Sequence, residues 1–280
     1  MPDASAFDGS TALRPARLAL FLATAIAAIS TVAPLLWMVS TALKGPDEVF
    51  DMNLVPERPT LDNLLYVFTK VDFLRFLWNT FFVSSTVTVA ALFFHSMAGY
   101  ALARLRFPGR EAIFLAMFST FLISLPVIVV PLFMLVRALG MLDSYVGLIV
   151  PSIFNAFGIF LLRQFYLSVP RELEEAALID GAGYWRIYWS IILPISRPIL
   201  SALAILFFLA NWNAFLWPLT IASDQKLWLV QVAVASFRAQ YVASWNYIMA
   251  ASTVVALPTI VMFVIFQKRI IESIKTTGIK

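Results

Sequence analysis

Residues 77–102 read LWNTFFVSSTVTVAALFFHSMAGYAL, an unbroken run without Asp, Glu, Lys or Arg. A helix needs about 20 residues to cross the roughly 30 Å hydrocarbon core of a bilayer. Inside that core every backbone amide must be hydrogen-bonded within the structure, which a helix achieves by itself. Barrel strands alternate apolar and polar side chains over about 10 residues, and this run does not alternate. The stretch therefore predicts a membrane-spanning helix.

Five further runs lack charged side chains over comparable lengths: residues 18–43, 112–136, 144–162, 198–223 and 239–267. The first is too long for a cleaved signal peptide, because its apolar run continues past any plausible h-region. The chain is 61% hydrophobic and only 13% charged, about half the charged share of a soluble domain. We therefore expect an all-α polytopic membrane protein with a six-transmembrane-helix bundle over residues 18–267.

Six crossings place both termini on one side of the membrane, and the basic residues indicate which side. If the termini are cytoplasmic, 13 of the 20 Lys and Arg residues lie inside, as the positive-inside rule requires. Arg104, Arg106 and Arg110 in one short loop are the best single indicator. We expect a multi-pass protein of the bacterial cytoplasmic membrane, with a cytoplasmic N-terminus (residues 1–17) and a cytoplasmic C-terminal tail (residues 268–280).

Two connections exceed what a helical hairpin needs. Residues 44–76 lie outside in this topology and are expected to form a folded cap or a short helix on the membrane surface. Residues 163–197 lie inside. Neither is long enough for a catalytic or nucleotide-binding domain, and the chain has no phosphate-binding Gly-x-x-x-x-Gly-Lys-Ser/Thr loop. Any energy from nucleotide hydrolysis would therefore have to come from a partner.

The inner connection contains VPRELEEAALIDGAGYWRIYWSIILPISRPIL at residues 169–200. Pro170 favours a helix start, and three glutamates then place negative charge at the helix's positive end. Ala176 and Ala177 form a small, flat face, and Gly181 ends the helix. A second segment, residues 184–192, carries four aromatic side chains suited to the head-group interface. We expect two short helices at an angle, with a small-residue tip suited to a partner's groove.

The same residues resemble the signature of bacterial ABC importer permeases: Glu-Ala-Ala at 175–177, Gly181 three residues later, then Ile191, Leu193 and Pro194. In that family the loop forms a coupling helix, which docks in a cleft of the ATPase subunit and transmits its closure to the membrane helices. The resemblance implies ATPase-docking roles for Glu175, Ala176, Ala177, Asp180 and Gly181. The alternative is a helical hairpin that only caps the bundle.

Three other stretches resemble the carbohydrate-uptake, maltose-type class of these permeases: AGYALARLRFPGR at 98–110, NWNAFLWPLTIAS at 211–223 and QKRIIESIKTTGIK at 267–280. The resemblance implies the type I ABC importer fold and a carbohydrate-like solute. It also implies three protein partners: a second homologous permease subunit, an ATPase subunit dimer, and an extracytoplasmic solute-binding protein. ATP and Mg would be bound by the ATPase, so this chain is expected to be non-catalytic and to need no cofactor.

Candidate solute-path residues lie in the fifth predicted span. Asn211, Trp212, Asn213 and Trp217 combine planar amides with aromatic faces, which are the groups that bind sugars, and polar amides at membrane depth are functional candidates. Asn211 and Asn213 cannot both point into one cavity on a regular helix, although Pro218 can open the helix locally. The alternative is that the asparagines join helices and that Trp217 anchors the outer interface.

The only histidine, His95, lies beside Ser96 in the second predicted span. A proton relay would need ionisable partners in other spans, which have none, so we expect a buried histidine hydrogen-bonded across helices. Asn155 is expected to serve packing. Pro126 and Pro131 are expected to kink the third span.

Two other function classes fit the sequence less well. An ion-coupled secondary transporter acting alone would need intramembrane charges or broken-helix repeats, and the six runs contain no charge. An intramembrane enzyme would need paired Asp, a Ser–His pair or a zinc site, so no catalytic residue and no metal site are expected.

The absence of cysteine also excludes disulfides and thiolate metal sites. The net charge of +4 is attributed to loops beside lipid head groups and not to a nucleic-acid surface. The outer loops carry no strong cationic cluster, which argues against a phosphorylated solute. The identity of the solute stays open.

Overall fold

A computed structural model describes residues 13–240 and 244–277, with side-chain surroundings for residues 17–237 and 244–266. All regular structure in these ranges is helical, as the charge-free runs predict. Residues 1–12 of the predicted N-terminal segment, 278–280 of the predicted tail and 241–243 of the predicted sixth span lie outside the described residues.

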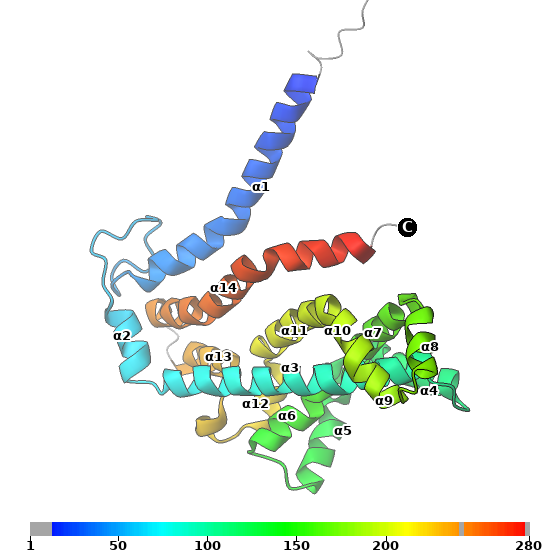
Figure 1. Cartoon of the computed structure of the whole chain (residues 1–280). Helices are drawn as coiled ribbons and strands as arrows, with labels where there is room; N and C mark the ends of the chain where they lie inside the picture. The colour runs from blue at the N-terminus through cyan, green and yellow to red at the C-terminus, as the bar shows by residue number, and fades with distance from the viewer. Residues whose placement is uncertain (1–12, 241–243, 278–280) are drawn as a thin grey trace, which may run out of the picture. The chain divides into compact units, whose positions relative to one another are not determined.

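Internal contacts divide the chain into two units, one holding residues up to 71 with 240–254, the other residues 72–239 with those from 255 onward. The first unit contains α1 Leu13–Ala42, α2 Asp62–Thr69 and the beginning of α14 Trp245–Thr277. The second contains α3 Phe73–Arg104, α4 Arg110–Ser119, η1 Thr120–Leu122, α5 Leu125–Ala138, α6 Tyr145–Ile153, α7 Ala156–Ser168, α8 Glu172–Ile179, α9 Tyr184–Ile187, the π-helix η2 Tyr188–Ile192, α10 Leu193–Ile195, α11 Arg197–Trp212, α12 Leu216–Ile221, η3 Gln225–Leu227, α13 Val230–Gln240 and the rest of α14 (Figure 1).

Among the described residues, three helices are long and apolar enough to cross a membrane: Arg17–Ala42, Phe73–Arg104 and Trp245–Phe266. Three further candidates are helix pairs bent at a short break: Arg110–Leu122 with Leu125–Ala138 (107°), Tyr145–Ile153 with Ala156–Ser168 (41°) and Tyr184–Ile195 with Arg197–Trp212 (74°). If each bent pair is one crossing, the number agrees with the six predicted spans. The bounds differ, because the charge-free runs do not show where a helix breaks.

Two of the breaks have causes in the sequence. Pro126 stands in the first turn of α5, directly after the sharp bend, where a missing N–H costs nothing, so its predicted kink is confirmed. Pro131 lies inside α5. Asn155 begins α7, and its Oδ1 accepts hydrogen bonds from the backbone N–H groups of Phe157 (3.0 Å) and Gly158 (3.3 Å). The expected packing role of Asn155 is thus a helix cap.

The predicted fifth span, residues 198–223, is also interrupted within its length. Helix α11 ends at Trp212 and α12 begins at Leu216. Pro218 has no N–H for the carbonyl of Ala214, and its ring would clash with that carbonyl in a continuous helix. The chain therefore leaves the helix over residues 213–215, which confirms the local opening expected from Pro218.

Helix α3 forms the centre of the second unit and packs most extensively against α7 and α11 (Figure 1). Gly99 permits the close approach of α7, since a Cβ there would lie 3.0 Å from Leu162 Cβ and 3.1 Å from Arg163 N. Small residues at such positions let membrane helices pack closely. Buried apolar side chains from α3, α7, α9, η2 and α11 form one cluster near the C-terminal end of α3.

In the first unit, the predicted cap at residues 44–76 contains the short helix α2, whose buried Asn63 joins three segments. Its Nδ2 donates to the carbonyls of Ala42 (2.9 Å), the last residue of α1, and Lys44 (2.8 Å), just after it. Its Oδ1 accepts from Asn246 Nδ2 at 2.7 Å, near the start of α14. One amide thus satisfies two carbonyls and a second buried amide.

We expect Asn63→Ala to lower the free energy of unfolding of the protein by about 1–3 kcal/mol, because it leaves buried polar groups without partners. Thermal unfolding in detergent would measure the change. Asn53→Ala, at an exposed position of the same connection, is the matched control and should leave the midpoint unchanged. Equal midpoints for the two variants would contradict this role for Asn63.

Candidate functional site

Helix α8 and the segment formed by α9 and η2, together residues 172–192, make up the predicted helical pair, here called the hairpin. Helix α8 begins at Glu172, two residues after Pro170, and has three acidic residues in its first turn. It ends as predicted at Gly181, which has a positive φ of 77°. Ala182 N–H then donates to the Ala177 carbonyl at 2.9 Å, which satisfies a terminal carbonyl of the helix.

The outer face of α8 carries most of the predicted docking residues. Four of the five are exposed: Glu175, Ala176, Asp180 and Gly181. Ala177 is half-buried and packs against the apolar cluster. A Cβ added at Gly181 would meet nothing within 4 Å, so the space beside Gly181 is open within the described chain.

Sequence reasoning missed Ile179, which lies on the same exposed face. Its side chain is 86% exposed, which is unusual for an isoleucine next to a tightly packed cluster. The helical spacing could have identified it, because Ile179 is three residues after Ala176 and therefore shares its helix face. The tip thus presents an apolar side chain beside the two exposed acidic residues, Glu175 and Asp180.

A buried ion pair holds α8 against the end of α3. Arg104 Nε lies 3.1 Å from Glu174 Oε1, and the side chains are 3% and 10% exposed. The two atoms are in contact by distance but are not aligned as a hydrogen bond. Arg104 Nη2 also donates to the carbonyl of Val169, just before the hairpin. Burial raises the pKa of the Glu174 carboxyl above its usual value, because the nearby charges of Arg104 and Arg171 offset the effect of burial only in part.

The second half of the hairpin is also bound to α3. Tyr188 is buried, and its hydroxyl lies 2.5 Å from Ser96 Oγ. Its ring centre lies 5.4 Å from that of Tyr100. The head-group location expected for the aromatic side chains of this segment therefore does not hold for Tyr188, whereas Trp185 is exposed.

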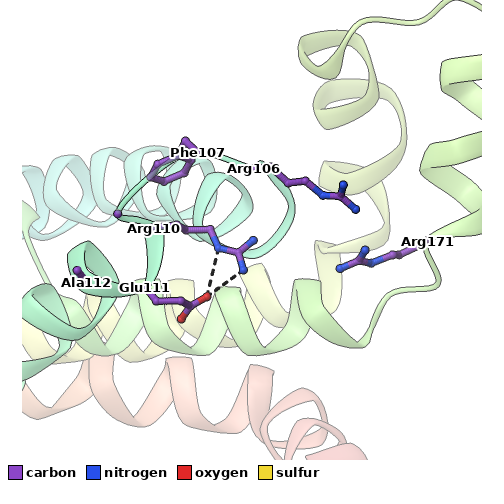
Figure 2. A pocket seen from close by; sticks show the side chains of 7 residues that line it. Arg106, Phe107, Arg110, Glu111, Ala112 and Arg171 are labelled. Carbon is purple, nitrogen blue, oxygen red and sulfur yellow. Dashed lines mark hydrogen bonds and ion pairs between the residues drawn. The ribbon is translucent and has the colours of Figure 1, made fainter.

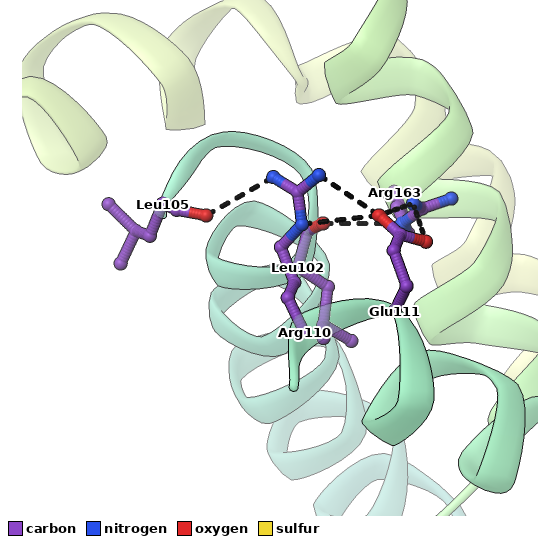
Figure 3. Close-up of polar contacts among 5 residues, drawn as sticks. All are labelled: Leu102, Leu105, Arg110, Glu111 and Arg163. Carbon is purple, nitrogen blue, oxygen red and sulfur yellow. Dashed lines mark hydrogen bonds and ion pairs between the residues drawn. The ribbon is translucent and has the colours of Figure 1, made fainter. Parts of the chain in front are cut away.

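A second charge network joins α7 to the end of α3 and the start of α4 (Figure 3). Arg163 Nη2 donates to both carboxylate oxygens of Glu111 at 3.0 Å, and its Nε donates to the Leu102 carbonyl at 3.2 Å. Arg110 Nη2 donates to Glu111 at 2.9 Å and its Nη1 to the Leu105 carbonyl at 3.2 Å. Arg163 thus lies inside α7, and the inner connection begins only after Ser168.

The two tryptophans among the solute-path candidates are buried in the second unit. Trp212 is 3% exposed and donates Nε1–H to the Val255 carbonyl at 3.2 Å. Trp217 is 5% exposed and donates Nε1–H to the Gly147 carbonyl at 3.2 Å. Both indole N–H groups are therefore used within the described chain, and Trp217 lies in a core cluster.

The two asparagines are more accessible. Asn211 is half-buried and donates Nδ2 to the Phe207 carbonyl at 2.8 Å. Asn213 is exposed, donates to the Leu209 carbonyl at 2.9 Å, and accepts from Gln231 Nε2 at 3.1 Å. Solute contact stays a prediction for all four candidates, and the structure adds Gln231 to the accessible polar groups.

His95 joins two helices, as predicted. It is buried in α3, and its Nε2 accepts the backbone N–H of Asn155 at 3.2 Å, at the start of α7. Its ring packs edge-on against Phe207 of α11, with 5.5 Å between ring centres. The hydrogen bond thus lies at the break between α6 and α7.

Comparison with known proteins gives consistent results. The sequence profile of the family described as "Binding-protein-dependent transport system inner membrane component" matches residues 95–276. The chain is 32% identical over 267 residues to the "Arabinooligosaccharides transport system permease protein AraQ" of Halalkalibacterium halodurans, covering 93% of this chain and 95% of that protein. It is 31% identical to the "Diacetylchitobiose uptake system permease protein NgcG" of Streptomyces coelicolor, covering 88% and 83%.

A further relative is the "sn-glycerol-3-phosphate transport system permease protein UgpE" of Yersinia enterocolitica, 34% identical over 78% of this chain and 80% of that protein. Among solved structures, a chain of a bacterial ABC transporter involved in the import of the acidic polysaccharide alginate matches with a TM-score of 0.84 at 23% identity. The match covers 96% of this chain and 99% of that chain. The predicted type I ABC importer fold is confirmed.

The buried ion pair yields a prediction for Glu174→Gln, which leaves the Arg104 charge buried without a counter-ion. We expect the opening free energy of the hairpin to fall by about 3 kcal/mol, measured as faster amide hydrogen exchange over residues 172–192. Glu172→Gln removes the same charge from the same helix turn at an exposed position and should leave exchange unchanged. Equal acceleration in both variants would show that the helix-end charge matters and the ion pair does not.

Proposed function

The chain belongs to the family of binding-protein-dependent transport system inner membrane components, and we propose that it carries a saccharide or saccharide derivative into the cell. It is a permease subunit of an ABC importer, and this reading is supported over an ion-coupled transporter acting alone. The proposed solute class rests on the relatives, two of which are permease proteins for arabinooligosaccharides and diacetylchitobiose.

We infer that the hairpin faces the cytoplasm and that both termini lie on that side. The basic residues support this orientation, since Arg104, Arg106, Arg110, Arg163 and Arg171 gather at the hairpin end of the second unit. Cytoplasmic loops of membrane proteins carry the excess of arginine and lysine. In this orientation the apolar helices of the chain lie in the lipid of the cytoplasmic membrane.

The proposed docking surface for the ATPase is the outer face of α8. Glu175, Ala176, Asp180 and Gly181 supply its exposed part, and Ala177 supports them from the side of the apolar cluster. Ile179 adds an apolar contact. The observation that carries the proposal is a helix held by a buried ion pair, with open space beside Gly181 at its end within the described part of the chain.

In this mechanism ATP and Mg bind to the partner ATPase dimer, and this chain performs no catalysis. Closure of that dimer displaces α8 as a rigid body. Because Glu174 is paired with Arg104 at the end of α3, displacement of α8 is transmitted directly to a membrane-spanning helix. The bundle, formed with a second homologous permease subunit, then changes from inward-facing to outward-facing and receives solute from an extracytoplasmic binding protein.

Solute contact is proposed for Asn211 and Asn213, with Trp212 and Trp217 shaping the surrounding wall. Asn213 is supported by its exposure and by its hydrogen bond to Gln231, which places an amide at the end of α11 beside an amide of α13. Planar amides of this kind bind saccharide hydroxyls as both donor and acceptor.

Ala176→Trp tests the docking surface. The position is exposed and helical, so the bulky side chain obstructs a partner's groove without disturbing the packing of this chain. We expect co-purified ATPase and ATP-dependent uptake each to fall by more than about tenfold, which corresponds to about 1.4 kcal/mol. Gly181→Glu should also block transport with the protein still inserted, but its positive φ adds backbone strain.

Ala138→Trp is the control for Ala176→Trp, because Ala138 is an exposed helical alanine in the last turn of α5. It should leave ATPase retention unchanged. Normal ATPase retention and uptake with Ala176→Trp would contradict docking on this face.

Asn213→Ala tests solute contact. Losing one hydrogen bond of about 1 kcal/mol should raise the KM for saccharide uptake several-fold at unchanged ATPase retention. Asn53→Ala, at an exposed asparagine of the first unit, should leave the KM unchanged. If alanine at Asn211 and at Asn213 each leaves uptake kinetics unchanged, the pair does not contact the solute.

A further inference from the structure

A cationic hollow lies beside the hairpin, between the loop that follows α3, the start of α4 and Arg171 (Figure 2). Its volume is about 470 Å³. A neighbouring hollow of about 430 Å³ reaches from the same loop to Glu174 and Glu175 of α8. Arg106, Phe107 and Arg171 line both, so the two hollows form one region bordered by α8.

Two of the arginines in this region form no ion pair in the described part of the chain, although Arg171 lies near enough to Glu174 for its charge to lower the pKa of that carboxyl. Arg106 and Arg171 are exposed, and neither makes a side-chain hydrogen bond or ion pair there. Figure 2 shows their guanidinium groups extending toward one another from different segments. Like charges held this way repel, and an anion placed between them would receive charge-assisted hydrogen bonds from both.

Arg110 and Glu111, the other charged residues that line the first hollow, are already paired. Arg110 is bound to Glu111 and to the Leu105 carbonyl, and Glu111 is bound to Arg163 as well. Glu111 is therefore already neutralised by Arg110 and Arg163 and does not pair with Arg106 or Arg171. The first turn of α4 also borders the hollow, and its backbone N–H groups add positive potential there, although Glu111 lies in the same turn.

The position of the hollow indicates the kind of anion. Arg106 lies two residues beyond the end of the membrane-spanning helix α3, and α4 begins the next candidate crossing at Arg110. Phe107, with an exposed ring, stands between them. Basic pockets at the cytoplasmic ends of membrane helices bind the head groups of anionic lipids, and a neighbouring aromatic ring suits the apolar part of such a molecule.

We propose that Arg106 and Arg171 bind the phosphate group of an anionic lipid of the cytoplasmic leaflet. The inference rests on the orientation given under the proposed function. The bound phosphate neutralises the two guanidinium groups and links the loop after α3 to the residue that precedes α8. Lipid occupancy thereby stabilises the hairpin in its position on α3.

The test compares two double variants of the importer, purified as the assembled complex. Arg106→Gln/Arg171→Gln removes the proposed site. Arg186→Gln/Arg197→Gln removes the same charge from two exposed arginines on the same proposed side that do not line the hollow. Native mass spectrometry would count bound phosphatidylglycerol during titration in detergent, with phosphatidylcholine and inorganic phosphate as further probes.

We expect the dissociation constant of one phosphatidylglycerol to rise about thirtyfold in Arg106→Gln/Arg171→Gln, since each arginine contributes roughly a fivefold factor. The control variant should match the wild type, and phosphatidylcholine should not compete. Equal weakening in both variants would overturn the site, because it would show a diffuse charge effect. Equally tight inorganic phosphate would overturn the lipid assignment.

A third outcome concerns the ATPase. If Arg106→Gln/Arg171→Gln releases the ATPase while lipid binding is unchanged, the two arginines bind an acidic partner surface and the lipid proposal is wrong. Saccharide uptake by the wild-type complex is measured separately. Its absence would contradict the proposed function, whereas the lipid titration is read without any transport.

Discussion

The hairpin depends on the buried ion pair between Arg104 and Glu174. Removing two charges from water costs several kcal/mol for each ion, so such a pair adds little net stability, but breaking it is expensive. Neither side chain can leave the other without a large penalty. The pair therefore defines where α8 lies relative to the end of α3. A part that transmits force needs such a defined position more than it needs extra stability.

The arginines at this end of the molecule serve two physical purposes. Arg104 and Arg163 are nearly buried and each binds a carboxylate together with a backbone carbonyl. Arg106 and Arg171 remain exposed and unpaired within the described chain. The excess of positive charge that indicates topology is thus partly structural and partly available for ligands. Counting basic residues does not separate the two groups, because the separation depends on which carboxylates lie nearby.

The solute-path candidates separate in a similar way. The indole groups of Trp212 and Trp217 hydrogen-bond to backbone carbonyls within the core, whereas Asn213 is exposed and paired with Gln231 of α13. The break over residues 213–215 allows this arrangement, because side chains before and after it do not share a single helical register.

The sequence alone determined that the chain is helical and spans a membrane, since long charge-free runs in lipid leave helices as the only satisfied backbone. It also located the end of α8, because Gly181 suits the left-handed backbone found there. Tertiary structure decided the rest. Arg104 and the Val169 carbonyl are 65 residues apart in the chain, and no local pattern states which helices become neighbours. The partner of a buried charge, and the burial of Trp212 and Trp217, follow from that packing.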